Sequence, residues 1–133
     1  MEHDIHNLQY SPDGAWVSFD VPAESTVFVT ALKGGTAGGR SEWIRVSEGA
    51  HASWSPDSKM VYMLSARDGF QCLWAQRLVP ETRQPAGEAF AVKHFHEARH
   101  VLPLNTLGFA LASDRFILPI AETRGNVWLA KLD

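Results

Sequence analysis

The feature that most constrains the fold is an internal repeat. Residues Tyr10–Phe19 (YSPDGAWVSF) recur as Trp54–Met63 (WSPDSKMVYM), and a weaker third copy is Ala110–Pro119 (ALASDRFILP). The second copy begins 44 residues after the first, and the third begins 56 residues after the second. Recurrence at a fixed period of this size is typical of stacked supersecondary units.

A second landmark follows each copy of the first. It reads TVFVTAL over Thr26–Leu32, CLWAQRL over Cys72–Leu78 and NVWLAKL over Asn126–Leu132. Two landmarks that recur three times in the same order indicate a true repeat. The longer second interval implies an insertion, which we place within Pro80–Gly87 and Glu97–Asn105.

Each landmark has the signature of β-structure. Val17, Phe19 and Val21 alternate with Trp16, Ser18 and Asp20, which is the period of a strand. Ser-Pro-Asp-Gly is a turn sequence in which Gly14 accepts a positive φ, and Ser58 in the second copy need not give the same geometry. No segment shows a convincing helical pattern. The expected strands are 7–10, 15–21, 26–32, 43–47, 51–54, 60–66, 72–78, 90–95, 107–111, 115–120 and 126–132.

A four-stranded unit of about 40–45 residues has the period of a β-propeller blade. The Ser-Pro-Asp-Gly turn, the aromatic residue before it and the later Val-Trp-Leu strand resemble the WD40-like repeats of TolB-type β-propellers. The resemblance implies an all-β fold: one partial propeller over residues 1–133, with antiparallel blades at about 5–47, 51–96 and 106–133. It further implies the C-terminal blades of a bacterial multidomain protein.

Three blades cannot close a ring that needs roughly four to eight. The outer faces would expose residues such as Trp16, Val17, Phe116 and Ile117, and 126–132 would be an unpaired edge. We therefore expect self-association of two copies into a six-bladed ring. The alternative is a segment of a longer propeller whose other blades lie elsewhere.

Composition excludes several functional classes. The chain has 12 Lys and Arg against 15 Asp and Glu, a net charge of -3, which argues against nucleic-acid binding. No apolar run approaches the roughly 20 residues of a membrane span, and we expect no membrane insertion. The single cysteine cannot form an intrachain disulfide. The N-terminus has no signal-peptide pattern, and the chain fits a periplasmic or a cytoplasmic parent protein.

The histidines near residue 95 are the candidates for metal binding. His94 and His96 are alternate residues at an expected strand end, so they could share a face and chelate Zn²⁺ or Ni²⁺. Glu97 or His100 could supply a third ligand. The alternative is a polar strand end with Phe95 in the core, and we commit to no metal or other cofactor.

Other apparent motifs have simpler explanations. Gly34–Ser41 nearly spells a phosphate-binding loop, but a strand pattern follows where a helix start is required, which favours a hairpin loop. Cys72 lies in an expected buried strand. Asp13 and Asp57 occupy equivalent turn positions. We therefore expect no catalytic residues.

The repeat without a catalytic constellation predicts a non-enzymatic β-propeller module that binds a protein or peptide. It would be the sensory or interaction part of a larger bacterial protein. One alternative is an accessory propeller that gates substrate for a hydrolase, as in prolyl-oligopeptidase-like enzymes. Another is a metal-dependent enzyme that uses His94, His96 and His100.

Overall fold

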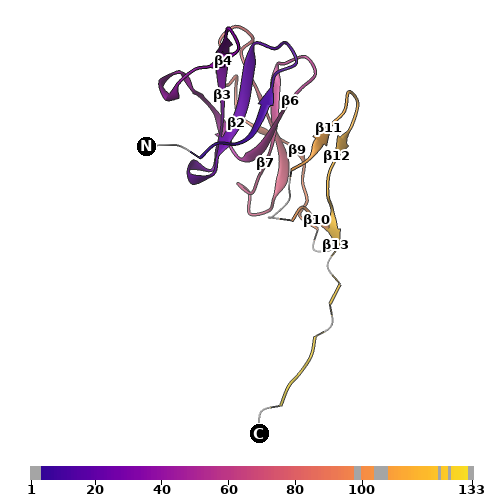
Figure 1. Cartoon of the computed structure of the whole chain (residues 1–133). Coiled ribbons are helices and arrows are strands. Elements are labelled where there is room, and N and C mark those ends of the chain that lie inside the picture. The colour runs from indigo at the N-terminus through magenta and orange to yellow at the C-terminus, as the bar shows by residue number, and fades with distance from the viewer. Residues whose placement is uncertain (1–3, 98–99, 104–107, 123, 126, 132–133) are drawn as a thin grey trace.

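The protein is all-β. The computed structural model describes residues 4–97, 100–103, 108–122, 124–125 and 127–131. Within these ranges the only helical elements are two single 3₁₀ turns, Pro22–Glu24 and Arg40–Glu42, and none of the described helices could cross a membrane. Figure 1 shows curled antiparallel sheets side by side, with a C-terminal segment that leads away from them.

The first sheet is a meander of consecutive hairpins. Its path is β1-β2-β3, and the far edge of β3 is shared by β4, which pairs with its end, and β5, which pairs with its first half. All pairings are antiparallel. The strands are β1 (His6–Tyr10), β2 (Trp16–Val21), β3 (Thr26–Lys33), β4 (Thr36–Ala37) and β5 (Ile44–Glu48).

The second sheet repeats this plan in the order β6-β7-β8-β9. Its strands are β6 (Ala50–Trp54), β7 (Met60–Ser65), β8 (Cys72–Arg77) and β9 (Phe90–Lys93). The strands expected in the first two units are confirmed to within one or two residues at each end. The period-two pattern and the turn chemistry therefore sufficed to place them.

The two repeat turns are built alike. The Ser11 hydroxyl donates to Asp13 at 2.5 Å, and the Ser55 hydroxyl donates to Asp57 at 2.6 Å. Gly14 has φ +71° and Ser58 has φ +60°. Ser58 thus adopts the left-handed conformation that Gly14 takes without cost, and the two turns share one geometry.

The main core lies between the two sheets. Val27 and Val29 of β3 face Val61 and Met63 of β7, and all four are fully buried. Trp16 packs against this cluster. The expectation that Trp16 and Val17 would face solvent is wrong: Trp16 is half-buried and Val17 is 1% exposed. Each sheet therefore buries one face against the other.

The outer faces of the two sheets carry smaller clusters. On the first sheet Phe19, Val21 and Phe28 pack with Trp43, whose ring meets Phe19 edge-on at 4.6 Å. On the second sheet Leu64 and Leu73 are buried together with Leu102, which follows β10, and partly buried residues from both the second and third units pack against them. The partners are Tyr62, Phe95, Phe109, Phe116 and Leu118.

The third unit is much less regular. Its described strands are two residues long: β10 (His100–Val101) pairs with β13 (Ala121–Glu122), and β11 (Ala110–Leu111) pairs with β12 (Phe116–Ile117). The expected strands 107–111 and 115–120 are therefore mostly wrong in length, and residue 107 lies outside the described residues. Phe116 is half-buried, whereas Ile117 is 62% exposed, as expected.

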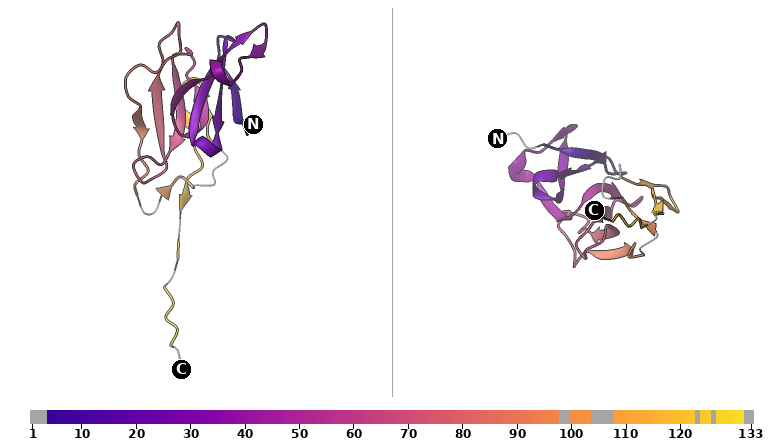
Figure 2. Two further views of the ribbon diagram at one scale, coloured as in Figure 1. Left: turned by 90° about the vertical axis from the view of Figure 1, so that its left-hand side faces the viewer. Right: turned by 90° about the horizontal axis from the view of Figure 1, so that it is seen from below.

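The last expected strand does not form. Residues 127–131, the C-terminal segment, have no strand pairing, and residues 126 and 132 lie outside the described residues. Figure 2 shows this segment leading away from the sheets in a second view.

Candidate functional site

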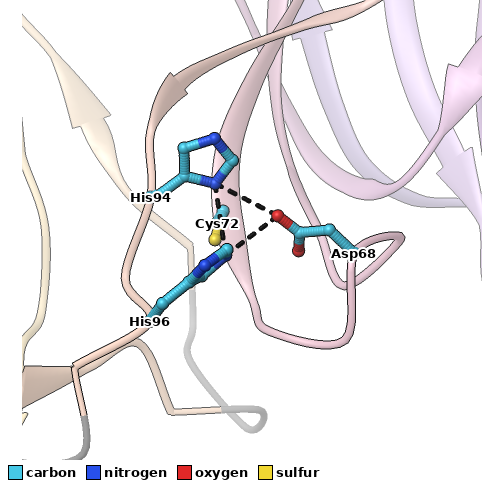
Figure 3. A group of neighbouring side chains, drawn as sticks. All are labelled: Asp68, Cys72, His94 and His96. Atoms are coloured by element: carbon cyan, nitrogen blue, oxygen red, sulfur yellow. Dashed lines mark hydrogen bonds and ion pairs between the residues drawn. The ribbon is translucent and has the colours of Figure 1, made fainter.

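The two histidines singled out by the sequence do lie together. They follow the end of β9, and His94 Nδ1 lies 3.2 Å from His96 Nε2. Their rings meet at 4.6 Å with a T-shaped geometry. Figure 3 shows both imidazoles turned toward the same point beside the start of β8. The two rings therefore lie together, although both residues follow the strand and do not alternate along it.

A carboxylate from a different loop completes the cluster. Asp68 lies between β7 and β8, and its Oδ2 is 2.9 Å from His96 Nε2 and 3.1 Å from His94 Nδ1. Its Oδ1 accepts a hydrogen bond from the Phe70 backbone N–H at 3.3 Å. Desolvation raises the pKa of Asp68, yet the hydrogen bonds from Phe70 and His96 outweigh it and hold this pKa below its ordinary value.

The fourth member is the thiol of Cys72. Cys72 begins β8 and is fully buried. Its Sγ accepts a hydrogen bond from the Phe95 backbone N–H at 3.3 Å. The donor atoms of Asp68, Cys72, His94 and His96 all lie within 4.8 Å of one another. We call these four residues the β8–β9 cluster.

Sheet register explains why this cluster forms. Leu73 of β8 pairs with Lys93 of β9, so the residue before Leu73 and the residue after Lys93 meet at one end of the hairpin. Cys72 and His94 are those residues. A residue at the end of β8 would have met the beginning of β9 instead, as Ala75 meets Phe90.

Aromatic contacts fix the two imidazole rings. Phe70 stacks on His96 at 4.5 Å with an interplanar angle of 29°, and Trp74 meets His94 edge-on at 5.9 Å. The Arg67 guanidinium lies 4.6 Å from the Trp74 ring. Packed rings of this kind hold a side chain in one orientation, so the cluster is oriented by its neighbours.

The cluster has a Cys–His–Asp composition, but it does not fit a nucleophilic site. Burial raises the pKa of the Cys72 thiol, so the reactive thiolate is disfavoured, and the sulfur is not exposed to a substrate. The same four groups are electron-pair donors of the types that bind transition metals. Metal binding is the chemistry that the arrangement supports.

His100 does not join the cluster. Its Nδ1 lies 3.5 Å from a carboxylate oxygen of Glu97, and the two side chains are mainly exposed. Glu97 and His100, which the sequence suggested as possible third ligands, are not among the four clustered residues. The cluster instead includes Asp68, which lies between the expected strands 60–66 and 72–78, and Cys72, which was expected in a buried strand.

The glycine-rich segment is a hairpin loop, as expected. Thr36–Ala37 pairs back onto the end of β3 and the chain continues into β5. Arg40 makes a bidentate ion pair with Glu24 at 2.9 and 3.0 Å, and its guanidinium lies over the Phe28 ring. Arg40 stands where a phosphate-binding loop has its lysine, and its side chain is already held by Glu24 and Phe28.

A polar pocket lies where the first two sheets meet at one end. Its lining includes Asn7, Asp20, Glu48 and His51. The buried Asp20 carboxylate accepts hydrogen bonds from the Asn7 side chain at 2.8 Å and from the His51 backbone N–H at 3.2 Å. These bonds join β2 to β1 and to β6, so the Asp20 carboxylate already has a structural role.

Exposed apolar side chains gather in two other places. The C-terminal segment carries Val127, Trp128 and Leu129 at 93%, 88% and 97% exposure. The edge strand β1 is exposed along its whole length and includes Leu8 and Tyr10.

Comparison of the sequence with protein-family models and with curated proteins gives no match. Function therefore has to be argued from the geometry of this chain.

Proposed function

We propose that the protein is a non-enzymatic interaction module, a three-blade wedge of a TolB-like β-propeller whose first partner is a second copy of itself. Two consecutive antiparallel meanders packed face to face, on a repeat of 44 residues, support the propeller assignment. Two wedges of three units give six blades, which is within the range of closed rings. The closed ring then presents its loops and channel mouth to a protein or peptide.

The observation that carries this proposal is a difference between equivalent residues. Leu73 and Ala75 of β8 are fully buried, as are Val27 and Val29 at the same positions of β3. Their equivalents in the third repeat, Val127 and Leu129, are exposed. The second landmark of the repeat is thus buried in the first two units, whereas its third copy is exposed to solvent.

The cost of that exposure favours association. Burial of apolar surface contributes about 25 cal/mol per Å², and an unpaired strand also leaves its N–H and C=O groups without partners. A second copy can cover the side chains and pair the backbone of the C-terminal segment. The exposed β1 edge and Ile117 give the partner further apolar surface.

The test is sedimentation velocity of the full chain over a wide concentration range. We expect the mass to rise from the monomer value of 14.7 kDa toward twice that value. Trp128→Lys should weaken association by roughly 30-fold or more, as expected of a central aromatic contact. Lys131→Ala, in the same segment, is the matched control and should leave association unchanged. A monomer at every concentration would contradict the proposal.

A further inference from the structure

The β8–β9 cluster has a geometry that suits a metal ion. Three donor atoms, Asp68 Oδ2, His94 Nδ1 and His96 Nε2, form a triangle with sides of 2.9, 3.1 and 3.2 Å. The Cys72 sulfur lies within 4.8 Å of each of them. The four atoms come from the loop before β8, from β8 itself and from the chain after β9 (Figure 3).

These spacings are close to those of a tetrahedral zinc site. Zinc–nitrogen and zinc–oxygen bonds of about 2.0–2.1 Å and a zinc–sulfur bond of about 2.3 Å place neighbouring ligands about 3.3–3.6 Å apart. The observed triangle has to open by only a few tenths of an ångström. The sulfur, which lies within 4.8 Å of the other donors, has to move inward by up to about 1.2 Å.

Hydrogen bonding alone satisfies this cluster poorly. His94 and His96 both direct a ring nitrogen at the same carboxylate oxygen and at each other. If both of these nitrogens carry protons, they repel one another at 3.2 Å. If neither does, three lone pairs converge without a donor. If only one does, its single proton can serve either the carboxylate oxygen or the other ring nitrogen, and the remaining lone pairs still face each other. A divalent cation at the centre satisfies all three atoms at once, because every group there can donate an electron pair.

Contacts outside the cluster prepare it for this role. The Phe70 backbone N–H engages Oδ1 of Asp68 and leaves Oδ2 for the cluster. Stacking by Phe70 and the edge of Trp74 hold the two rings. Outer contacts of this kind orient the ligands of protein metal sites, and here they come from the β7–β8 loop and from β8.

The donor set selects the metal. Two imidazoles, one thiolate and one carboxylate suit zinc, whereas calcium and magnesium require oxygen ligands. Four protein donors fill a tetrahedral site and leave no position for a substrate, so the site is structural. On binding, the Cys72 thiol loses its proton to solvent as the sulfur–zinc bond forms.

We infer that Asp68, Cys72, His94 and His96 bind one Zn²⁺ ion, which clasps the β7–β8 loop to the chain that leaves β9. This clasp closes the open end of the β8–β9 hairpin and fixes the direction in which the chain enters the third unit. The site is independent of the association proposed above, since none of its four residues belongs to the C-terminal segment or to β1.

The experiment measures bound zinc in the full chain, without a histidine tag, after dialysis against Zn²⁺. We expect one Zn²⁺ per chain and a rise in Tm on zinc addition. The double variant His94→Ala/His96→Ala should lose both. The matched control His100→Ala removes a nearby exposed histidine and should keep both. Because His94 and His96 are largely exposed, the double variant is expected to stay folded.

Cobalt tests the sulfur ligand directly. Co²⁺ in this site should give a sulfur-to-cobalt charge-transfer absorption that disappears in Cys72→Ser. Asp68→Asn keeps the sulfur ligand and should weaken zinc binding by more than the roughly 10–100-fold that is typical of losing an outer contact. If Cys72→Ser does not fold, Asp68→Asn tests the site in its place. Absence of stoichiometric zinc, loss of zinc in His100→Ala, or cobalt binding without the charge-transfer band would overturn the inference.

Discussion

Arg83 and Asp13, which lie 70 residues apart in the chain, form an ion pair of 2.7 Å between the loop after β8 and the first repeat turn. A second nitrogen of the Arg83 guanidinium donates to the Ser58 carbonyl at 2.7 Å. The guanidinium also lies 5.9 Å from the rings of both Trp16 and Trp54. The inserted loop after β8 thus reaches back to hold the first two units together.

Removing this arginine should destabilise the protein. Arg83 is 6% exposed, and Arg83→Met leaves the buried Ser58 carbonyl without its donor. We expect the free energy of unfolding to fall by about 1–3 kcal/mol, less than for a fully buried pair because Asp13 is partly exposed. Urea unfolding measures the change. The control Arg115→Met breaks an exposed pair with Asp114 and should cost less than about 0.5 kcal/mol. Equal losses in the two variants would contradict this role.

Stability should fall in acid through the two repeat-turn aspartates. The Ser11 and Ser55 hydroxyls, followed by backbone N–H groups of the turns, lower the pKa of Asp13 and Asp57 below the ordinary value. A lowered folded-state pKa stabilises the protein above the unfolded pKa of about 4 and loses this effect as pH falls through the folded value. Urea unfolding at several pH values should show a shallower acid loss in Asp13→Asn/Asp57→Asn. An unchanged slope would contradict the assignment.

Gly49 is required where the first sheet passes into the second. Its φ is +147°, and a Cβ there would lie 2.8 Å from the Leu64 carbonyl oxygen and 2.9 Å from Met63 Cγ. We expect Gly49→Ala to cost about 1–3 kcal/mol of unfolding free energy. The control Gly39→Ala meets no atom within 4 Å and should change stability by less than about 0.5 kcal/mol. Thermal unfolding of both variants tests the difference, and a stable Gly49→Ala protein would refute it.

Equivalent residues of two repeats should behave differently in dilute solution. Leu73→Ala removes a side chain that is 1% exposed and should lower the free energy of unfolding by about 2–5 kcal/mol. Val127→Ala should leave the stability of the dilute monomer unchanged, because Val127 is 93% exposed. It should instead weaken association in sedimentation experiments. A comparable stability loss in both variants would show that the C-terminal segment is already packed in the monomer.

Local pattern was enough to predict most of the first two sheets. The alternation at Val17, Phe19 and Val21 and the Ser-Pro-Asp turns depend on neighbours in the chain, so they can be recognised in the sequence. The two-residue strands β4, β10 and β13 were missed because a pairing that short has no period. The segment 126–132 has residues typical of a strand. A strand also needs a neighbouring strand to pair with, and the local sequence pattern does not show whether one is present.

Only two of the four residues of the candidate metal site could be predicted from the sequence. His94 and His96 are only two residues apart in the sequence, so they could be recognised as a pair, although both follow the end of β9 rather than lying on the expected strand. Asp68 and Cys72 lie more than 20 residues earlier, and only the β8–β9 register brings them to the histidines. That register could have been proposed from the two expected strands, 72–78 and 90–95, which form one hairpin. The ion pair between Arg83 and Asp13 could not be predicted in this way, because no local sequence pattern indicates it.

Amide hydrogen exchange of residues 127–131, compared between dilute and concentrated protein, tests the interaction module most directly. The account predicts fast exchange in the dilute monomer and strong protection at concentrations where two copies associate, because the segment then pairs as a strand. Fast exchange of these amides in the associated protein would contradict it.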